Sequence, residues 1–187
     1  MSKKIVAELR PLFEPKSIAI IGASNAPEKW GNWMVARPVN SGYRGHIYPI
    51  NPKDKEVFGL KAYPRVFDVP GPVDLAIITV PAPAVPDAMQ DCVKKGVKAG
   101  VVITAGFAET GARGKALQDE VVKIAQKGRI RIVGPNGMGI WSSAVRLNAA
   151  FLFTPQAGGI SFLSQSGTMG GYLLQTADNK GYGFMPS

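Results

Sequence analysis

The chain has 187 residues, of which 45% are hydrophobic and 19% charged, and this composition excludes an intrinsically disordered chain. Its net charge of +9 is spread along the sequence rather than gathered in one basic run, so nucleic acid is not expected as a partner. A single cysteine, Cys92, excludes an intrachain disulfide and sites built on several cysteines. No metal site and no membrane span are expected, and we expect a cytoplasmic protein.

Apolar runs typical of strands recur through the first 135 residues and alternate with segments of helical periodicity. The strands are predicted at residues 17–22, 46–51, 74–80, 100–104 and 130–133. Strands that alternate with helices form parallel sheets, and several of these runs are apolar on both faces. The sequence therefore predicts an α/β fold, with a doubly wound, Rossmann-like sheet over residues 10–135.

Two of the intervening helices have clear ends. Residues 84–95 and 111–127 each place apolar side chains on one face, and a glycine follows each of them directly. A helix after Gly31 is expected to be kinked or shortened by Pro38. Residues 58–70 are expected to form a loop with at most a short helical turn.

The residues after 135 are predicted to begin a second unit. No steady period is found over residues 141–157, whereas 159–163 are predicted as a buried strand and 168–180 as a helix. One such βα unit cannot cover its own sheet edges. Residues 136–187 are therefore predicted to be a linker and the start of a second α/β domain, and the chain is expected to be a fragment of a longer protein.

The segment from Ser17 to Gly31, SIAIIGASNAPEKWG, predicts a phosphate site. An apolar strand ends at Gly22, which lets an anion approach the backbone closely. The helix expected after Gly31 would add unpaired N–H groups and the positive end of its dipole. A simple tight turn between strand and helix is the alternative.

These residues depart from the fingerprint of an NAD site. Ser24 and Pro27 stand where the second and third glycines of the dinucleotide fingerprint would be, and the second strand ends in Asn51-Pro52-Lys53 with no acid for a ribose hydroxyl. Lys53 would attract a further phosphate instead. NADP and coenzyme A both carry one, and these residues leave the choice between them open.

Six short motifs occur in order along the chain, and each by itself is weak. They are Gly22-Ala23-Ser24, Tyr48-Pro49-Ile50-Asn51-Pro52-Lys53, Val80-Pro81-Ala82, Ile103-Thr104-Ala105-Gly106-Phe107, Gly134-Pro135-Asn136 and Ser164-Gln165-Ser166-Gly167. Together they resemble the NDP-forming acyl-CoA synthetase superfamily, which includes ADP-forming acetate–CoA ligases, the α subunit of succinyl-CoA synthetase and related protein lysine acetyltransferases. The resemblance runs from about residue 10 to the end.

This resemblance implies that CoA and acyl-CoA are the ligands. It places the CoA phosphates on the loop at residues 22–31, with Ser24 as a hydroxyl donor, and on Lys53 as a point charge. The adenosine and pantetheine would follow the carboxyl ends of the later strands. The expected cofactor-binding residues are Gly22, Ala23, Ser24, Asn25, Lys53, Val80, Pro81, Ala82, Thr104, Ala105, Gly106 and Asn136.

The resemblance also implies a flavodoxin-like, succinyl-CoA-synthetase-like second domain that begins after residue 135. In the family a helix at this place points its N-terminus at a phosphohistidine. Ser164, Ser166 and Gly167 are therefore expected to contact phosphate, at an anion site made by the N–H groups of residues 167–169.

Several parts of such a ligase are not expected within this chain. The phosphohistidine lies in the family's second domain beyond Ser187, and His46, the only histidine here, is outside that motif. The ATP-grasp domain or subunit, which would bind ATP, ADP and Mg²⁺, is missing, and Gly137 replaces a cysteine usual in the family. The resemblance thus implies a CoA-binding portion without catalytic residues, and it allows a homo-oligomer.

Three other functions stay open, namely a CoA-binding regulatory module, a protein lysine acetyltransferase relative and an NADP-dependent oxidoreductase. Individual residues also keep two interpretations. Glu109 is either a carboxylate of the site or an acid that favours a helix start. Trp30 and Trp33 either cover an adenine or take part in helix packing.

Overall fold

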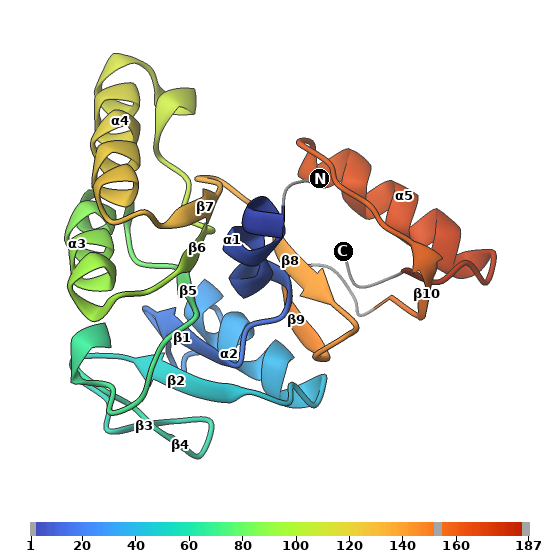
Figure 1. Cartoon of the computed structure of the whole chain (residues 1–187), viewed down its shortest axis with the longest axis horizontal. Coiled ribbons are helices and arrows are strands. Elements are labelled where there is room, and N and C mark those ends of the chain that lie inside the picture. The colour runs from blue at the N-terminus through green and yellow to red at the C-terminus, as the bar shows by residue number, and fades with distance from the viewer. Residues whose placement is uncertain (1–2, 152–154, 185–187) are drawn as a thin grey trace.

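The computed structural model describes residues 3–151 and 155–184 (Figure 1). Its centre is a five-stranded parallel sheet in the order β2-β1-β5-β6-β7. The predicted Rossmann-like α/β fold is confirmed, and all five strands predicted within residues 10–135 are present. The strands are β1 (Ser17–Ile21), β2 (His46–Ile50), β5 (Leu75–Ile78), β6 (Ala99–Val102) and β7 (Arg131–Val133).

Helices cover both faces of this sheet, which explains why its strands are apolar on both sides. Helices α3 (Val85–Lys95) and α4 (Ala112–Lys127) lie on one face, and α1 (Lys3–Phe13) and α2 (Trp30–Asn40) on the other (Figure 1). Side chains alternate along β1, so Ile21 packs with the α3 and α4 cluster and Ile20 with the α1 and α2 cluster. Two apolar cores result, one on each side of the sheet.

The strand order reverses next to β1, which has β2 on one side and β5 on the other. Chain connections leave a crevice at the carboxyl ends of the strands where the order of a doubly wound sheet reverses, and ligands bind there. The turn that begins at Gly22 follows β1 at this point. The fold therefore places the predicted phosphate loop at the position where such sheets bind ligands.

A β-hairpin beyond residue 135 also belongs to the packing of the first sheet. Strands β8 (Gly139–Ser142) and β9 (Leu147–Ala150) pair antiparallel, and the fully buried Leu147 and Ala149 join the core cluster on the α1 and α2 face. The sequence analysis found no steady period here. All four residues of β9 are buried, the polar Asn148 among them, so apolar and polar residues do not alternate along this strand.

Other short elements were also missed from the sequence. Helix α1 contains Pro11, whose missing N–H removes one helical hydrogen bond, so this segment lacks the signals of a regular helix. The expected loop at residues 58–70 holds β4 (Leu60–Lys61), which pairs with β3 (Glu56–Val57). The short helical turn that was expected in this loop is the 3₁₀ turn η1 (Val66–Asp68). Two further 3₁₀ turns are η2 (Ala82–Ala84) and η3 (Ala108–Thr110).

The prediction of a buried strand over residues 159–163 is wrong. Strand β10 spans Ala157–Ile160, all four of its residues are exposed, and Leu163 is 94% exposed. Within the described ranges β10 forms only isolated bridges to Phe184, so no sheet packs on it. The predicted helix follows as α5 (Gly167–Asn179). No helix in the described part of the chain combines the length and apolar character needed to cross a membrane.

Asp74 ties together the amino ends of the central strands. Its carboxylate accepts hydrogen bonds from the Lys16 backbone N–H at 2.9 Å and from Lys98 Nζ at 2.7 Å, while its own N–H donates to Ser17 Oγ at 3.0 Å. Burial favours the neutral acid, but the bonds and charges of Lys98 and Lys16 outweigh burial and lower the pKa of Asp74.

We expect Asp74→Asn to lower the free energy of unfolding by about 1–3 kcal/mol at neutral pH, because the charged acceptor is lost. A lowered folded-state pKa stabilises the fold above the usual carboxyl pKa and ceases to do so as the pH falls through the folded value. The difference between wild type and variant, measured by urea unfolding, should therefore shrink below about pH 4. Asp119→Asn, at an exposed pair with Lys115, is the control; an equal effect there would contradict the role of Asp74.

Candidate functional site

The turn after β1 requires glycine at two positions. Gly22 has φ of +94°, and a Cβ there would lie 2.7 Å from Thr79 Oγ1. Gly31, in the first turn of α2, approaches the same turn so closely that a Cβ would lie 1.8 Å from the Gly22 carbonyl oxygen. Helix α2 therefore begins directly against the turn, which is the arrangement that brings helical N–H groups to a phosphate.

Asparagine side chains fix the loop by binding its carbonyl oxygens. Asn51 Nδ2 donates to the Ala23 carbonyl at 2.9 Å, and Asn32 Nδ2 donates to the Ser24 carbonyl at 3.2 Å. Asn25 bridges to the β3–β4 hairpin, donating to the Glu56 carbonyl at 2.9 Å. With these carbonyls held, the backbone N–H groups of Ser24 and Asn25 have no hydrogen-bond partner among the described residues. Such unpaired N–H groups suit an anion.

The Ser24 hydroxyl lies within this loop. Its oxygen accepts from the Ala26 N–H at 3.1 Å, and the residue is only 7% exposed. A hydroxyl that accepts one bond still has its hydrogen to donate. Ser24 can therefore act as the hydroxyl donor that the sequence analysis expected, toward a ligand in contact with the loop.

Asn51 also shapes the loop that carries Lys53. Its Oδ1 accepts from the N–H groups of Lys53 at 2.7 Å and Asp54 at 3.0 Å, so one side chain holds both the loop after β2 and the turn after β1. Lys53 is exposed, and its ammonium forms no ion pair with any described residue. Asn51 lies within one of the six sequence motifs but is not among the site residues predicted from the sequence. The Asn51-Pro52 dipeptide at the end of a strand was the sequence feature that could have indicated this role, because asparagine side chains often bind the backbone of turns.

The remaining predicted cofactor residues lie along the same edge of the sheet. Thr104 Oγ1 donates to the Val80 carbonyl at 2.7 Å, and the Asn136 N–H donates to the Thr104 carbonyl at 2.9 Å. Gly106, with φ of +106°, packs against Ala82, and Pro81 and Ala105 are exposed beside them. Together with the Gly22 turn these residues form a continuous rim at the strands' carboxyl ends.

A pocket of about 370 Å³ opens beside this rim at the reversal of strand order. It lies between the Gly22 turn and helix α3, and its size is within the range of small-molecule sites, about 300–1,000 Å³. Apolar side chains and three charged ones line it, and the sequence analysis selected none of the charged ones. The principal lining residues are Gly22, Ile50, Pro52, Arg65, Val80 and Asp91.

Glu109 binds its own loop. The Gly106 N–H donates to Glu109 Oε1 at 2.6 Å, and the backbone N–H groups of Gly106, Glu109 and Phe107 lower the pKa of this carboxyl. The carboxylate therefore helps to hold the segment after Thr104 in place. This role is close to the second interpretation of Glu109, an acid that favours the start of a helix.

The two tryptophans beside the loop pack on the hairpin. The Trp30 and Phe151 rings meet edge to face with their centroids 4.3 Å apart, and Trp33 Nε1 donates to the Pro27 carbonyl at 2.9 Å. Trp30 and Trp33 nevertheless stay about half exposed. Their contacts agree with helix packing, the second of the two interpretations.

The start of α5 only partly matches the expected anion site. Ser166 caps the helix, because its Oγ accepts from the Met169 N–H at 3.2 Å, and Ser164 Oγ donates to the Ser166 carbonyl at 2.9 Å. The Met169 N–H and the Ser164 hydroxyl are thus already engaged, which corrects the expectation that both are free. Gly167 lies against Met138, since a Cβ there would be 2.1 Å from Met138 Cγ.

Among the described residues no group of three or more histidine, cysteine, aspartate or glutamate side chains is placed to hold a metal ion.

Comparison with known proteins identifies the family of this chain. The model of the family described as CoA binding domain matches residues 16–142. The α subunit of an ADP-forming acetate–CoA ligase II from Pyrococcus furiosus is 44% identical over 92% of this chain and 37% of its own length. An ADP-forming 4-hydroxybutyrate–CoA ligase from Nitrosopumilus maritimus is 39% identical over 93% of this chain and 25% of its own length.

Solved structures agree with these relatives. An acetyl-coenzyme A synthetase from Ca. Korarchaeum cryptofilum, in complex with phosphate and ADP, superposes with a TM-score of 0.90 at 41% identity, over 94% of this chain and 38% of that one. The chain thus spans well under half the length of these proteins. It belongs to the CoA binding domain family, and it corresponds to the N-terminal CoA-binding region of proteins of the NDP-forming acyl-CoA synthetase superfamily.

Proposed function

We propose that this chain is the CoA-binding portion of an NDP-forming acid–CoA ligase. The whole enzyme would convert acyl-CoA, a nucleoside diphosphate and phosphate into the free acid, CoA and a nucleoside triphosphate. The observation that carries the proposal is the Gly22 turn, whose free N–H groups adjoin a pocket at the reversal of strand order. A phosphohistidine and an ATP-grasp domain or subunit, with ADP or ATP and Mg²⁺, would lie outside residues 1–187.

Within this proposal the rim residues divide by position. The CoA phosphates would contact Gly22, Ala23, Ser24 and Asn25, with Lys53 as an added charge. The pantetheine would pass Val80–Ala82, Thr104–Gly106 and Asn136 toward the start of α5. The relatives differ in the acid they are named for, acetate or 4-hydroxybutyrate, yet resemble this chain to a similar degree. This suggests that the acyl group is selected by another part of the enzyme.

We also propose that a second domain begins within residues 136–187. Because the β8–β9 hairpin packs on the first sheet, we assign the hairpin to the CoA-binding domain. The second domain would then begin with β10 and α5, whose exposed apolar side chains, such as Leu163 and Tyr172, suit continuation into a larger unit.

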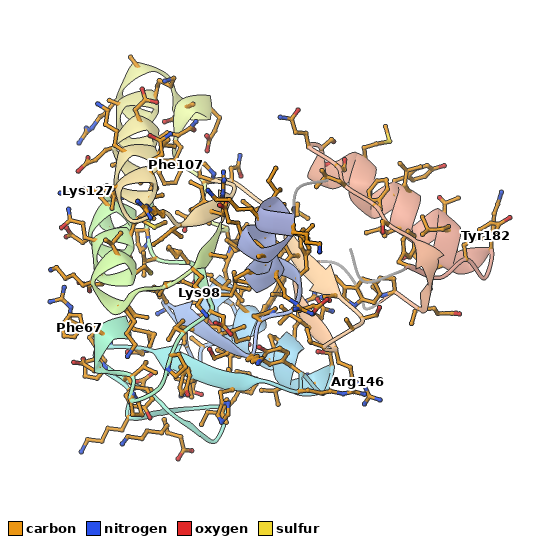
Figure 2. The ribbon with its side chains drawn as sticks, in the orientation of Figure 1. Phe67, Lys98, Phe107, Lys127, Arg146 and Tyr182 are labelled. Carbon is orange, nitrogen blue, oxygen red and sulfur yellow. The ribbon has the colours of Figure 1, made fainter. Side chains whose placement is uncertain are left out.

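Calorimetry with CoA, dephospho-CoA and NAD tests the ligand. We expect CoA to bind more tightly than dephospho-CoA, because Lys53 meets the additional phosphate, and NAD to bind hardly at all. Lys53→Ala should weaken CoA binding by about 0.5–2 kcal/mol, the range of a partly exposed charge-assisted contact, with little effect on dephospho-CoA. Lys127→Ala, at the end of α4 away from the rim (Figure 2), is the matched control. Equal affinity for CoA and NAD would contradict the proposal.

The chain alone should not complete the ligase reaction, because it holds neither the phosphohistidine motif nor a nucleotide domain. We expect no ATP when the 187-residue chain is incubated with acetyl-CoA, ADP, phosphate and Mg²⁺ and assayed with luciferase. ATP above the level of a heat-inactivated sample would show that the catalytic parts lie within this chain.

A further inference from the structure

A second pocket, of about 200 Å³, shares no lining residue with the pocket beside Gly22. It lies between the tip of the β8–β9 hairpin, the end of α2 and the segment that leads into β10. Its volume is below the range of about 300–1,000 Å³ that is usual for small-molecule sites, so it suits a ligand of only a few atoms. The lining residues are Ser41, Trp141, Ser143, Arg146, Pro155 and Ala157.

Hydrogen bonds to the backbone hold the hairpin tip against the end of α2. Ser41 Oγ donates to the Arg146 carbonyl at 2.6 Å, and the Arg44 N–H donates to the Val145 carbonyl at 3.2 Å. The Arg146 N–H closes the turn by donating to the Ser143 carbonyl at 3.2 Å. The pocket wall is therefore fixed without using the side chains of Ser143 and Arg146, which stay available for a ligand.

Three of the lining side chains carry hydrogen-bond donors that have no partner. The Arg146 guanidinium, the Ser143 hydroxyl and the Trp141 indole N–H form no hydrogen bond or ion pair with any described residue. None of the described residues that line the pocket is acidic, so the guanidinium charge is not neutralised there. A pocket with a free cation and two further donors favours an anion.

Arg146 also occupies a backbone position that favours glycine. Its φ is +56°, in the left-handed region where few residues other than glycine are found (the residue is labelled in Figure 2). A Cβ on Gly42 would lie 3.8 Å from Arg146 Nη1, so the arginine side chain lies along the end of α2. Residues held in such strained conformations cluster at ligand sites, and here the strained residue carries the charge of the pocket.

We propose that this pocket binds a small oxyanion, a carboxylate or a phosphate, through the Arg146 guanidinium, with the Ser143 hydroxyl and the Trp141 N–H as further donors. A guanidinium binds either group through two parallel hydrogen bonds. The bound anion would join the hairpin to the segment before β10, because both line the pocket. The inference goes beyond CoA binding and does not rest on the proposed function.

NMR on the whole chain tests this site through the indole N–H signals of the three tryptophans. Trp141→Phe identifies the signal of Trp141. We expect this signal to shift saturably at millimolar phosphate or acetate, when either anion replaces chloride at constant ionic strength. The anion that gives the saturable shift identifies which of the two groups the site takes.

Arg146→Gln should weaken this binding by at least about tenfold, the effect of losing one charge-assisted contact. Ser143→Ala should weaken it less, and it decides the question if melting temperatures show that Arg146→Gln does not fold. Arg129→Gln is the matched control and should bind like wild type. Arg129 is also exposed, with φ of +54° and no ion pair to any described residue, but it lines neither pocket.

Two results would overturn the inference. One is the absence of a saturable shift of the Trp141 signal with either anion. The other is equal binding by Arg146→Gln and Arg129→Gln, which would assign the anion to another place such as the Gly22 turn. CoA affinity is measured separately, so neither result alters the standing of the proposed function.

Discussion

Replacing Gly31 by alanine is expected to lower the free energy of unfolding by about 3 kcal/mol, at the upper end of overpacking effects. The added Cβ would lie 1.8 Å from the Gly22 carbonyl oxygen, a backbone atom that no side-chain rotation can move away. Helix α2 would have to withdraw from the turn, and the phosphate loop would open with it. CoA affinity measured by calorimetry should therefore fall together with the stability measured by urea unfolding.

Gly159→Ala provides the matched control. A Cβ at residue 159 meets nothing within 4 Å, and its glycine has no left-handed φ. The same chemical change should there alter stability by no more than about 0.5 kcal/mol. If Gly31→Ala behaves like Gly159→Ala, α2 does not begin against the Gly22 turn, and the geometry of the site is incorrect.

Asn51→Ala is expected to weaken CoA binding by about 2 kcal/mol, or roughly thirtyfold. The asparagine binds the Ala23 carbonyl on one loop and the Lys53 and Asp54 N–H groups on the other, so its loss releases the two loops that hold phosphate. Stability should fall by about 1–2 kcal/mol, since these groups are half-buried. Calorimetry with CoA and urea unfolding measure the two effects.

Asn51→Asp separates the two halves of this bridge. Aspartate keeps an oxygen for the Lys53 and Asp54 N–H groups but cannot donate to the Ala23 carbonyl. It should therefore be at least as harmful to CoA binding as alanine. Asn40→Ala, at the exposed end of α2, is the control and should change neither quantity. Full affinity in Asn51→Asp would show that the contact with the Gly22 turn is dispensable.

The regular part of the fold was predictable because it depends on local pattern. The runs at residues 18–21 and Leu75–Ile78 are apolar at every position, as strands buried on both faces must be, and all four residues of β5 are buried. The elements that were missed depend on distant contacts. The β8–β9 hairpin is held by the burial of Leu147 and Ala149 against helices far away in sequence, and the burial of Asn148 between them removes the alternation of apolar and polar residues.

The sequence by itself determined the sheet, the position of the Gly22 turn and the family, because glycine placement, strand hydrophobicity and the order of the short motifs are all local properties. Only the tertiary structure decided which side chains meet at the site. Asn51 reaches Ala23, and Arg65 reaches Asp91 across 26 residues, because parallel strands bring their carboxyl ends to one edge and helix α3 packs beside them. Such pairings arise from the packing of the sheet and helices, and no spacing along the chain encodes them.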